Sequence, residues 1–418
     1  MKITIGLSLS LTGEYAPLAR QAETALRLFV ADINAGDAIR LGGERCEFVL
    51  ECHDDASNSS RCAGIYRALC ADSRIGIIFG PYSNRLARIA APVAAETRRI
   101  FINHGGAGDE LYERGNRMIV GVLSPASDYM RGFIRLLSTL KLWRKRLAII
   151  ASPTSFARAV AAGIEKAAAE RAARLRGLRI RVKWNGAFDP DASPTKLFPA
   201  LRRNRVNALV SAGSYEHDVA VMGAVAESPL DIPVLGCVAA GVRRFGADLG
   251  EHAEGIVGPS QWEEIATIDP EIGPSPAEFA RRMNAAGVDA PDYPSAQAYA
   301  AGLLTAAAIN EAGSLDTEKI RAAFSDLRTT TLFGGFSIDR VTGRQLGHAM
   351  LLVQWHAGRK VIIQPEAHTD VGSLDFPSGW RLLLAGLDAL KLSRRDDRPE
   401  EYDDANDETK EKNERSQD

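Results

Sequence analysis

The chain has 418 residues, of which 45% are hydrophobic and 25% are charged, and its formal net charge is −2 at pH 7. This length exceeds what one compact core accommodates and predicts two domains with additional segments, while the composition is typical of a globular protein. The nearly balanced charge gives no indication of a nucleic-acid partner, and no apolar run approaches the roughly 20 residues that a membrane-spanning helix requires.

Strand and helix patterns alternate through the first part of the chain. The segment KITIGLSLS predicts a strand, a long amphipathic helix ends near Gly36, and EFVLECHDD predicts the next strand, followed by a helix over 61–71. Two further strands end at Gly80 and Asn103. Repeated strand–helix–strand units of this kind predict a parallel sheet with helices on both faces.

A second series of the same kind begins near Met118 and predicts a second doubly wound domain. After Gly255 the alternation stops. Three successive helices are predicted over 276–286, 295–312 and 317–327. A hairpin over 348–365 follows, with its turn at Ala357 and Gly358.

The end of the chain has a different composition. Residues 380–392 predict a short amphipathic helix within a C-terminal extension over 366–392. From residue 394 to the end, six basic and eleven acidic residues leave almost no apolar side chains. Such a segment buries too little surface to order itself, so residues 393–418 are predicted to form a disordered acidic tail.

Two neighbouring strands of the first domain end in small polar residues. One strand ends at Gly80 and is followed by Pro81, Tyr82, Ser83 and Asn84, which open a helix, and the other is followed by the segment HGGA. In open α/β sheets ligands bind at the carboxyl ends of strands, and the free N–H groups of a helix start favour an anion. This stretch therefore predicts one wall of a small-molecule cleft.

Motifs that would indicate catalysis are missing. The chain contains no GxSxG, HExxH or GxxxxGK[ST] motif and no GxGxxG after a strand, so an enzyme is not predicted. His53, Asp54 and Asp55 stand at a strand end, where a capped loop is a commoner arrangement than a metal site, and no metal or cofactor is predicted. The five cysteines (Cys46, Cys52, Cys62, Cys70 and Cys237) match no zinc spacing; they are interpreted as buried thiols, although a strand-to-helix disulfide stays open.

The order of motifs resembles the type I periplasmic binding proteins, in particular the branched-chain amino-acid (Leu/Ile/Val) binding family of ABC transporters. The resemblance covers about residues 2–365 and rests on a series of segments, each weak alone. They are IGLSLSLTGEYA, VADINAGD, ECHDDASNSS, IIFGPYSN, APVAAE, INHGGAGDELYERG, VGVLSPASDY, EGIVGPSQW, PDYPSAQAYAAGLL and FGGFSIDRVTGRQLGHAMLLVQW.

The resemblance implies two Rossmann-like α/β lobes with parallel central sheets, joined by three crossovers, that close on a ligand about a hinge. Lobe one is expected over 1–120 and 255–328, and lobe two over 121–254 and 329–365. It further implies a monomeric solute-binding protein that delivers a small amino acid, carboxylate or amide to an ABC transporter permease.

The family's ligand positions carry over residue by residue. Ser83 and Asn84 match the loop that holds the ligand carboxylate, and the segment Gly105, Gly106 and Ala107 matches a second site for the carboxylate and the amine. Phe156 and then Tyr215 match the aromatic positions of lobe two. The acidic residue that faces the ligand ammonium in the family matches Val238.

Val238 departs from the family pattern, because an ammonium buried without an anion costs several kcal/mol. Either Glu216 or Asp218 replaces the missing acid, or the ligand has no ammonium. His104 is a candidate for an added hydrogen bond. An aromatic-tolerant pocket is expected from Tyr15, Tyr82, Phe156, Tyr215 and Trp262, some of which could instead pack in the lobe cores.

One alternative function stays open at this point, a cytosolic ligand-sensing regulator built on the same fold. The first residues pass directly into a strand without a signal peptide, and the cysteine count is odd, and both features favour the sensor. The family resemblance instead implies a periplasmic location.

Overall fold

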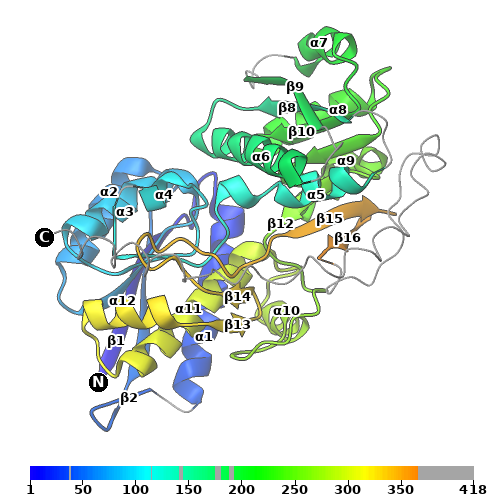
Figure 1. Ribbon diagram of the computed structural model, residues 1–418. Helices are drawn as coiled ribbons and strands as arrows, with labels where there is room; N and C mark the ends of the chain where they lie inside the picture. The colour runs from blue at the N-terminus through cyan, green and yellow to red at the C-terminus, as the bar shows by residue number, and fades with distance from the viewer. Residues whose placement is uncertain (37–38, 114, 141–144, 175–179, 188–192, 366–418) are drawn as a thin grey trace, which may run out of the picture.

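The computed structural model describes residues 1–36, 39–113, 115–140, 145–174, 180–187 and 193–365. They form two α/β lobes, each built on its own sheet (Figure 1). The predicted doubly wound fold is confirmed. The predicted helix over 380–392 and the acidic tail lie outside the described residues.

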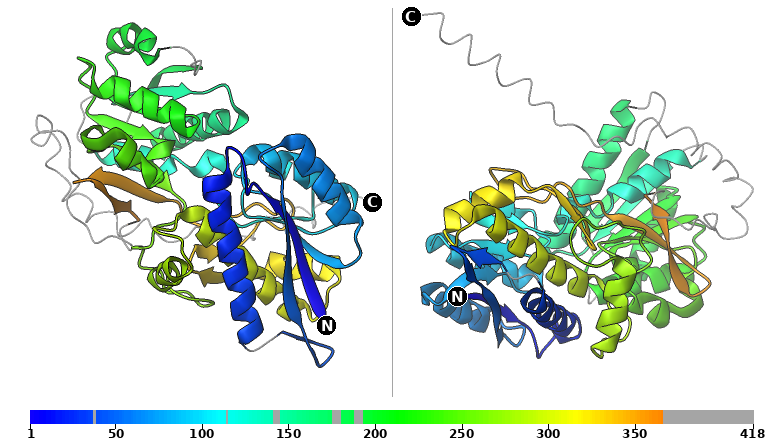
Figure 2. Two further views of the ribbon diagram at one scale, coloured as in Figure 1. Left: turned by 180° about the vertical axis from the view of Figure 1, so that it is seen from behind. Right: turned by 90° about the horizontal axis from the view of Figure 1, so that it is seen from below.

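Lobe one is built on a five-stranded parallel sheet and two short hairpins. Its elements are β1 (Lys2–Leu9), α1 (Ala16–Ala35), β2 (Arg40–Leu41), β3 (Glu44–Arg45), β4 (Glu47–Asp54), α2 (Ser59–Ala71), β5 (Ile75–Phe79), α3 (Asn84–Glu96), β6 (Phe101–Asn103), α4 (Glu110–Glu113), β7 (Ile119–Gly121), α10 (Pro276–Ala285), α11 (Tyr293–Ala312), α12 (Thr317–Asp326), β13 (Thr329–Thr331) and β14 (Gly334–Phe336). The strand order is β4–β1–β5–β6–β7. Figure 2 shows α1 and α11 lying together over one face of this sheet.

Lobe two is built on a seven-stranded sheet. Its elements are α5 (Arg131–Thr139), β8 (Lys145–Ala151), α6 (Ser155–Arg174), β9 (Ile180–Ala187), the 3-10 turn η2 (Pro194–Leu197), α7 (Phe198–Arg203), β10 (Ala208–Ala212), α8 (Tyr215–Ala226), β11 (Val234–Cys237), the 3-10 turns η3 (Val238–Gly241) and η4 (Gly250–Ala253), α9 (Arg244–Leu249), β12 (Val257–Ser260), β15 (Leu351–His356) and β16 (Arg359–Gln364). The order is β16–β15–β12–β11–β10–β8–β9, and β15 runs antiparallel to its two neighbours, β12 and β16, while the other pairs are parallel.

Three connections join the lobes. The first is 122–130, which contains the 3-10 turn η1 (Ala126–Asp128), the second is 261–275, and the third is 337–350. The chain passes from lobe one to lobe two through the first, returns through the second, and reaches β15 through the third.

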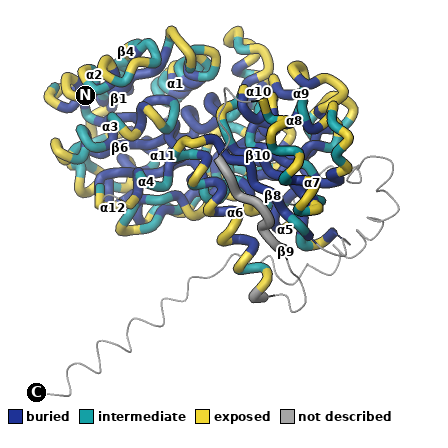
Figure 3. Tube along the Cα trace, turned by 90° about the horizontal axis from the view of Figure 1, so that it is seen from above, coloured by how far each residue is buried: buried dark blue, intermediate teal, exposed yellow. Residues whose placement is uncertain are grey.

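Alternating side chains explain how the sheets are covered. In β1 the residues Ile3, Ile5, Leu7 and Leu9 all face the core that α1 and α11 close, as expected for the period of two along a strand. Figure 3 shows the buried segments running through the middle of each lobe, with exposed residues along the outer helices. No helix among the described residues combines the length and the apolar character needed to cross a membrane.

The strands differ from the predicted lobe boundaries at two places. β12 belongs to the seven-stranded sheet of lobe two, although lobe one was expected to resume at residue 255. In the β13–β14 hairpin Leu332, Phe333 and Phe336 fill the core of lobe one, where lobe two was expected from residue 329. Both segments are short, and their lobe depends on tertiary packing: each joins the lobe whose sheet or core its few side chains complete. The local sequence does not carry this information.

The structure also tests the predictions for the hairpin turn, the cysteines and the loop after β4. The hairpin turn at Ala357 and Gly358 is confirmed, with positive φ at both residues. All five cysteines are free, so the disulfide left open from the sequence is not present. The capped loop predicted for the His-Asp-Asp segment is present, because the Asp54 carboxylate accepts from the N–H groups of Leu11, Thr12 and Ala56.

Candidate functional site

Three tyrosines gather at the carboxyl edge of the lobe-one sheet. Tyr82 follows β5, and its hydroxyl lies 2.8 Å from that of Tyr293 at the start of α11. The ring of Tyr15, just before α1, meets the Tyr82 ring edge-on at 6.4 Å. Burial raises the pKa of Tyr82 and of Tyr293 above the ordinary value, so both hydroxyls stay neutral and serve as hydrogen-bonding groups.

Two further aromatic side chains, one on the first connection and one in lobe two, lie against this group. The ring of Tyr129 meets that of Phe156 edge-on at 5.3 Å, and both side chains pack against the core of lobe one and the core of lobe two. The Tyr129 hydroxyl also acts electrostatically on those of Tyr82 and Tyr293. We call Tyr15, Tyr82, Tyr129, Phe156 and Tyr293 the aromatic group; it lies where the two lobes meet.

Polar contacts cross from lobe to lobe beside the aromatic group. The Ser155 hydroxyl at the start of α6 lies 3.4 Å from Asn84 Nδ2 and 3.4 Å from Arg88 Nη1, both on α3. A second contact is made by the Arg243 N–H of lobe two, which donates to Asp292 Oδ2 of lobe one at 3.3 Å. The lobes are therefore in direct contact next to Phe156 and next to Tyr293.

The loop expected to hold a carboxylate is braced by its own hydrogen bonds. Ser83 Oγ caps α3 by accepting from the Leu86 N–H at 3.3 Å, and the Ser83 N–H donates to the Gly105 carbonyl at 3.1 Å. Asn84 Oδ1 accepts from the Gly108 N–H at 2.8 Å. These bonds hold the two predicted ligand loops of lobe one together, and a direct grip of Ser83 and Asn84 on a ligand stays a prediction.

Close backbone approach explains the glycines of the second loop. A Cβ at Gly105 would overlap the Pro81 carbonyl oxygen, and one at Gly106 would overlap the Ala87 side chain. Ala107, the last residue of this predicted segment, is buried in the core of lobe one. The sequence GGA is therefore required by loop packing, whether or not it touches ligand.

His104 and Trp262 are buried in lobe one. The His104 ring lies 5.9 Å from that of Phe79, and neither ring nitrogen has a hydrogen-bond partner among the described residues. Burial lowers the pKa of His104 to about 4, so the ring is neutral at physiological pH. The Trp262 ring packs at 5.8 Å against Phe279, and its contact with ligand stays a prediction.

The predicted residues of lobe two are spread more widely. Tyr215 lies under the Arg244 guanidinium, 4.4 Å from ring centroid to Cζ, and its hydroxyl donates to Asp248. Glu216, one residue further on, is exposed. Val238 packs against a core cluster of lobe two. Tyr129 and Phe156 of the aromatic group pack against the same cluster as Val238. A ligand role of Tyr215, Glu216 and Val238 stays a prediction.

The Asp218 carboxylate is held by hydrogen bonds within lobe two. Its carboxylate is buried and accepts from Ser211 Oγ at 2.7 Å and from the Ala239 N–H at 3.0 Å. It thus caps the turn that follows β11, immediately after Val238. A carboxylate held in this way is poorly placed to neutralise a ligand ammonium in place of the missing family acid.

Three residues of this region were not predicted from the sequence: Tyr129, Gln261 and Tyr293. Gln261 is buried and donates through Nε2 to the Tyr129 hydroxyl at 3.1 Å. Tyr293 is the first residue of α11, two positions before the start predicted for this helix from its proline. Among the described residues, no group of three or more His, Cys, Asp or Glu side chains could hold a metal ion.

The fold and the site define a protein of two α/β lobes that meet at an aromatic group and are joined by three connections, an architecture suited to enclosing a small molecule. The family model described as periplasmic binding protein matches residues 2–360, and the chain belongs to this family.

Several solved structures share the fold of this chain. A leucine-binding protein from Thermotoga maritima shares 15% sequence identity, with 86% of this chain and 97% of that chain covered and a TM-score of 0.70. A solute-binding protein from R. palustris in complex with benzoate shares 17% identity over 90% and 99% of the two chains, with a TM-score of 0.69. A Streptococcus pneumoniae branched-chain amino-acid binding protein in complex with isoleucine shares 18% identity over 90% and 100%, with a TM-score of 0.67.

Proposed function

We propose that this protein is the solute-binding component of an ABC transporter and that its ligand is an aromatic carboxylate rather than an α-amino acid. The observation that carries the proposal is the aromatic group at the meeting of the lobes. It offers ring faces and neutral hydroxyls, which suit a flat ring that carries an oxygen-rich substituent.

The surroundings of the aromatic group favour an anion over a zwitterion. Arg85 stands at its rim, with Cζ 5.2 Å from the Tyr15 ring centroid and Nε donating to the Tyr15 hydroxyl. Val238 replaces the family acid, and Asp218 is held by Ser211 and Ala239. A cation, paired at 3.4 Å with Glu14, thus lies at the rim, whereas the family's acid position offers a ligand ammonium no carboxylate.

Relatives with both kinds of ligand share the fold. The structures from R. palustris contain benzoate or 4-hydroxybenzoate, and others contain leucine or isoleucine. At this level of identity they do not decide between the ligand classes, which is why the argument rests on the side chains. Family membership favours transport over the intracellular sensor, and we propose that the protein acts outside the cytoplasmic membrane, as a monomer, beside a permease.

A ligand panel tests the proposal directly. We expect benzoate and 4-hydroxybenzoate, at about 100 times Kd, to raise the melting temperature by several degrees, and leucine and isoleucine to leave it unchanged. Calorimetry should then give a Kd for the aromatic acids. Stabilisation by leucine without any response to the benzoates would refute the choice of ligand.

A matched pair of variants locates the site. Phe156→Ala should weaken binding of 4-hydroxybenzoate about tenfold or more, because the ring packs between the lobes. Phe198→Ala removes a half-buried ring on α7 that packs against a different cluster of lobe two, and should leave affinity unchanged. Equal effects of the two variants would exclude the aromatic group as the site.

A further inference from the structure

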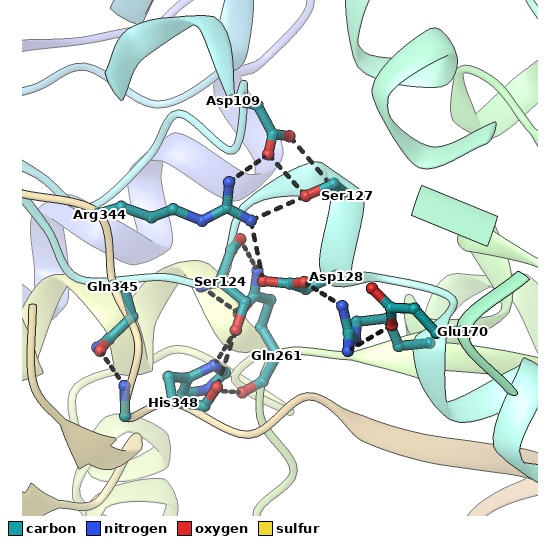
Figure 4. A network of polar contacts seen from close by, with 11 residues as sticks. Asp109, Ser124, Ser127, Asp128, Glu170, Gln261, Arg344, Gln345 and His348 are labelled. Carbon is teal, nitrogen blue, oxygen red and sulfur yellow. Dashed lines mark hydrogen bonds and ion pairs between the residues drawn. The ribbon is translucent and has the colours of Figure 1, made fainter. Parts of the chain in front are cut away.

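Each of the three connections contributes one buried polar side chain to a single hydrogen-bonded cluster. Ser124 comes from the first connection, Gln261 from the second and His348 from the third; we call these three residues the connection cluster (Figure 4). Ser124 Oγ lies 2.7 Å from His348 Nδ1, and His348 Nε2 lies 3.0 Å from the Gln261 carbonyl. The Gln261 side chain closes the cluster by donating to the Ser124 carbonyl at 3.0 Å.

These contacts fix which atom donates and which accepts. Because the Gln261 carbonyl can only accept, His348 Nε2 carries the proton and Nδ1 accepts from the Ser124 hydroxyl. Burial lowers the pKa of His348 to about 4, which keeps this neutral form at physiological pH. Breaking any bond of the cluster would leave a buried polar atom without a partner, so the three connections behave as one unit.

Gln261 links this cluster to the aromatic group. Its Nε2 donates both to the Ser124 carbonyl and to the Tyr129 hydroxyl, at 3.0 and 3.1 Å. The Tyr129 oxygen therefore acts as an acceptor toward Gln261, and its own proton has no hydrogen-bond acceptor among the described residues. That proton is available to an oxygen placed beside Tyr82 and Tyr293.

We propose that Tyr129 donates a hydrogen bond to the bound ligand, and that Gln261 is a positioning residue which sets the direction of this bond and couples it to the connection cluster. The ligand atom is an acceptor such as a carboxylate or phenol oxygen. The proposal deepens the proposed function and rests on it for the identity of the ligand, whereas the coupling of the three connections can be tested without any ligand.

The ligand-free test uses amide hydrogen exchange. Gln261→Met keeps the length of the side chain and removes its hydrogen bonds, and should raise exchange in all three connections. Tyr66→Phe is the matched control, because it deletes a buried hydroxyl that donates to the Phe79 carbonyl, remote from the connections. Faster exchange in 261–275 alone, or equal changes in the control, would overturn the coupling.

The ligand-dependent test is a double-mutant cycle with 4-hydroxybenzoate as the probe. Tyr129→Phe and Gln261→Met should each weaken binding about tenfold, the scale of one hydrogen bond to a charged group. The double variant should bind no more weakly than Tyr129→Phe alone, a result that general loosening of the fold would not give. Additive losses, or unchanged affinity of Tyr129→Phe, would overturn the positioning role.

An error in the proposed ligand can be distinguished from an error in the role of Tyr129. If the wild type binds no benzoate but gains stability from leucine, the ligand assignment is wrong, and the same cycle is run with leucine, whose carboxylate offers the same acceptor. Tyr129 is excluded as a ligand contact only when the wild type binds a probe and Tyr129→Phe binds it equally well.

Discussion

Two buried histidines show how the surroundings of a side chain decide what it contributes. His348 uses both ring nitrogens in the connection cluster. His104 is equally buried, but its nitrogens have no hydrogen-bond partner among the described residues. Burial lowers the pKa of both to about 4. In each case the folded state excludes a proton that the unfolded chain would bind, so each histidine makes stability depend on pH.

The sign of this dependence follows from the two pKa values of His104. Its pKa falls from the ordinary 6.5 to about 4 on folding, so between these values the unfolded state binds more protons. Full stability is therefore present above pH 6.5, and on the order of 3 kcal/mol is lost as the pH falls toward 4. We expect His104→Leu, which does not titrate, to flatten the curve of unfolding free energy against pH in this range.

Urea unfolding followed from pH 4 to pH 7 measures this effect. His252→Leu, a change at an exposed histidine in η4 of lobe two, controls for the loss of a histidine as such and should give the wild-type curve. A His104→Leu curve parallel to that of the wild type would show that His104 is not the group responsible.

At the level of elements, the loop after β6 depends on a backbone contact. Gly105 packs so closely against the segment after β5 that a Cβ would overlap the Pro81 carbonyl oxygen. The Ser83 N–H also donates to the Gly105 carbonyl, so the two loops form one surface under Tyr82. Any side chain at Gly105 must push the loops apart.

Gly105→Ala should therefore lower the free energy of unfolding by about 1–3 kcal/mol, the usual cost of overpacking. The comparison is Gly64→Ala in α2, where no atom lies within 4 Å of the new Cβ. There alanine should be neutral or stabilising by up to about 1 kcal/mol, because it is the better helix former. Urea unfolding of the two variants measures the difference, and equal stabilities would contradict the close packing of the loops.

Local patterns predicted most of these elements, because the signal for a strand or a helix lies within the segment. The loop around Ser83 could be found because it ends a recognisable strand. The site itself could not be assembled in this way. The partners Tyr82 and Tyr293 are 211 positions apart, and Gln261 and Tyr129 are 132 apart. Only tertiary packing brings them together, and it also assigned β12 and the β13–β14 hairpin to their lobes.

For the whole molecule, the relative position of the lobes depends on a second set of contacts beside the connection cluster. Arg344, on the third connection, donates through Nη1 to Asp109 at 2.9 Å and through Nη2 to Asp128 at 3.2 Å (Figure 4). Asp109 belongs to the lobe-one loop that follows β6, and Asp128 lies on the first connection next to lobe two. One guanidinium thus joins lobe one to the first and the third connection.

Replacing this arginine should affect both stability and lobe position. In Arg344→Met two carboxylates lose their shared cation, and the Asp109 side chain is only 14% exposed, so the repulsion is poorly screened. We expect a loss of about 1–3 kcal/mol in unfolding free energy. We also expect a larger radius of gyration in small-angle scattering, because Arg131, 3.8 Å from Asp128, offsets only the Asp128 charge and does not bridge the two carboxylates.

An exposed ion pair on α10 provides a control for the loss of stability expected in Arg344→Met. Arg281 contacts Glu278 on α10 at 2.7 Å, but its side chain is 69% exposed, and such pairs contribute at most about 1 kcal/mol. Arg281→Met should therefore change neither the radius of gyration nor, beyond that small amount, the stability. If Arg344→Met behaves like Arg281→Met in both measurements, other contacts hold the lobes, and Arg344 has no influence on their position.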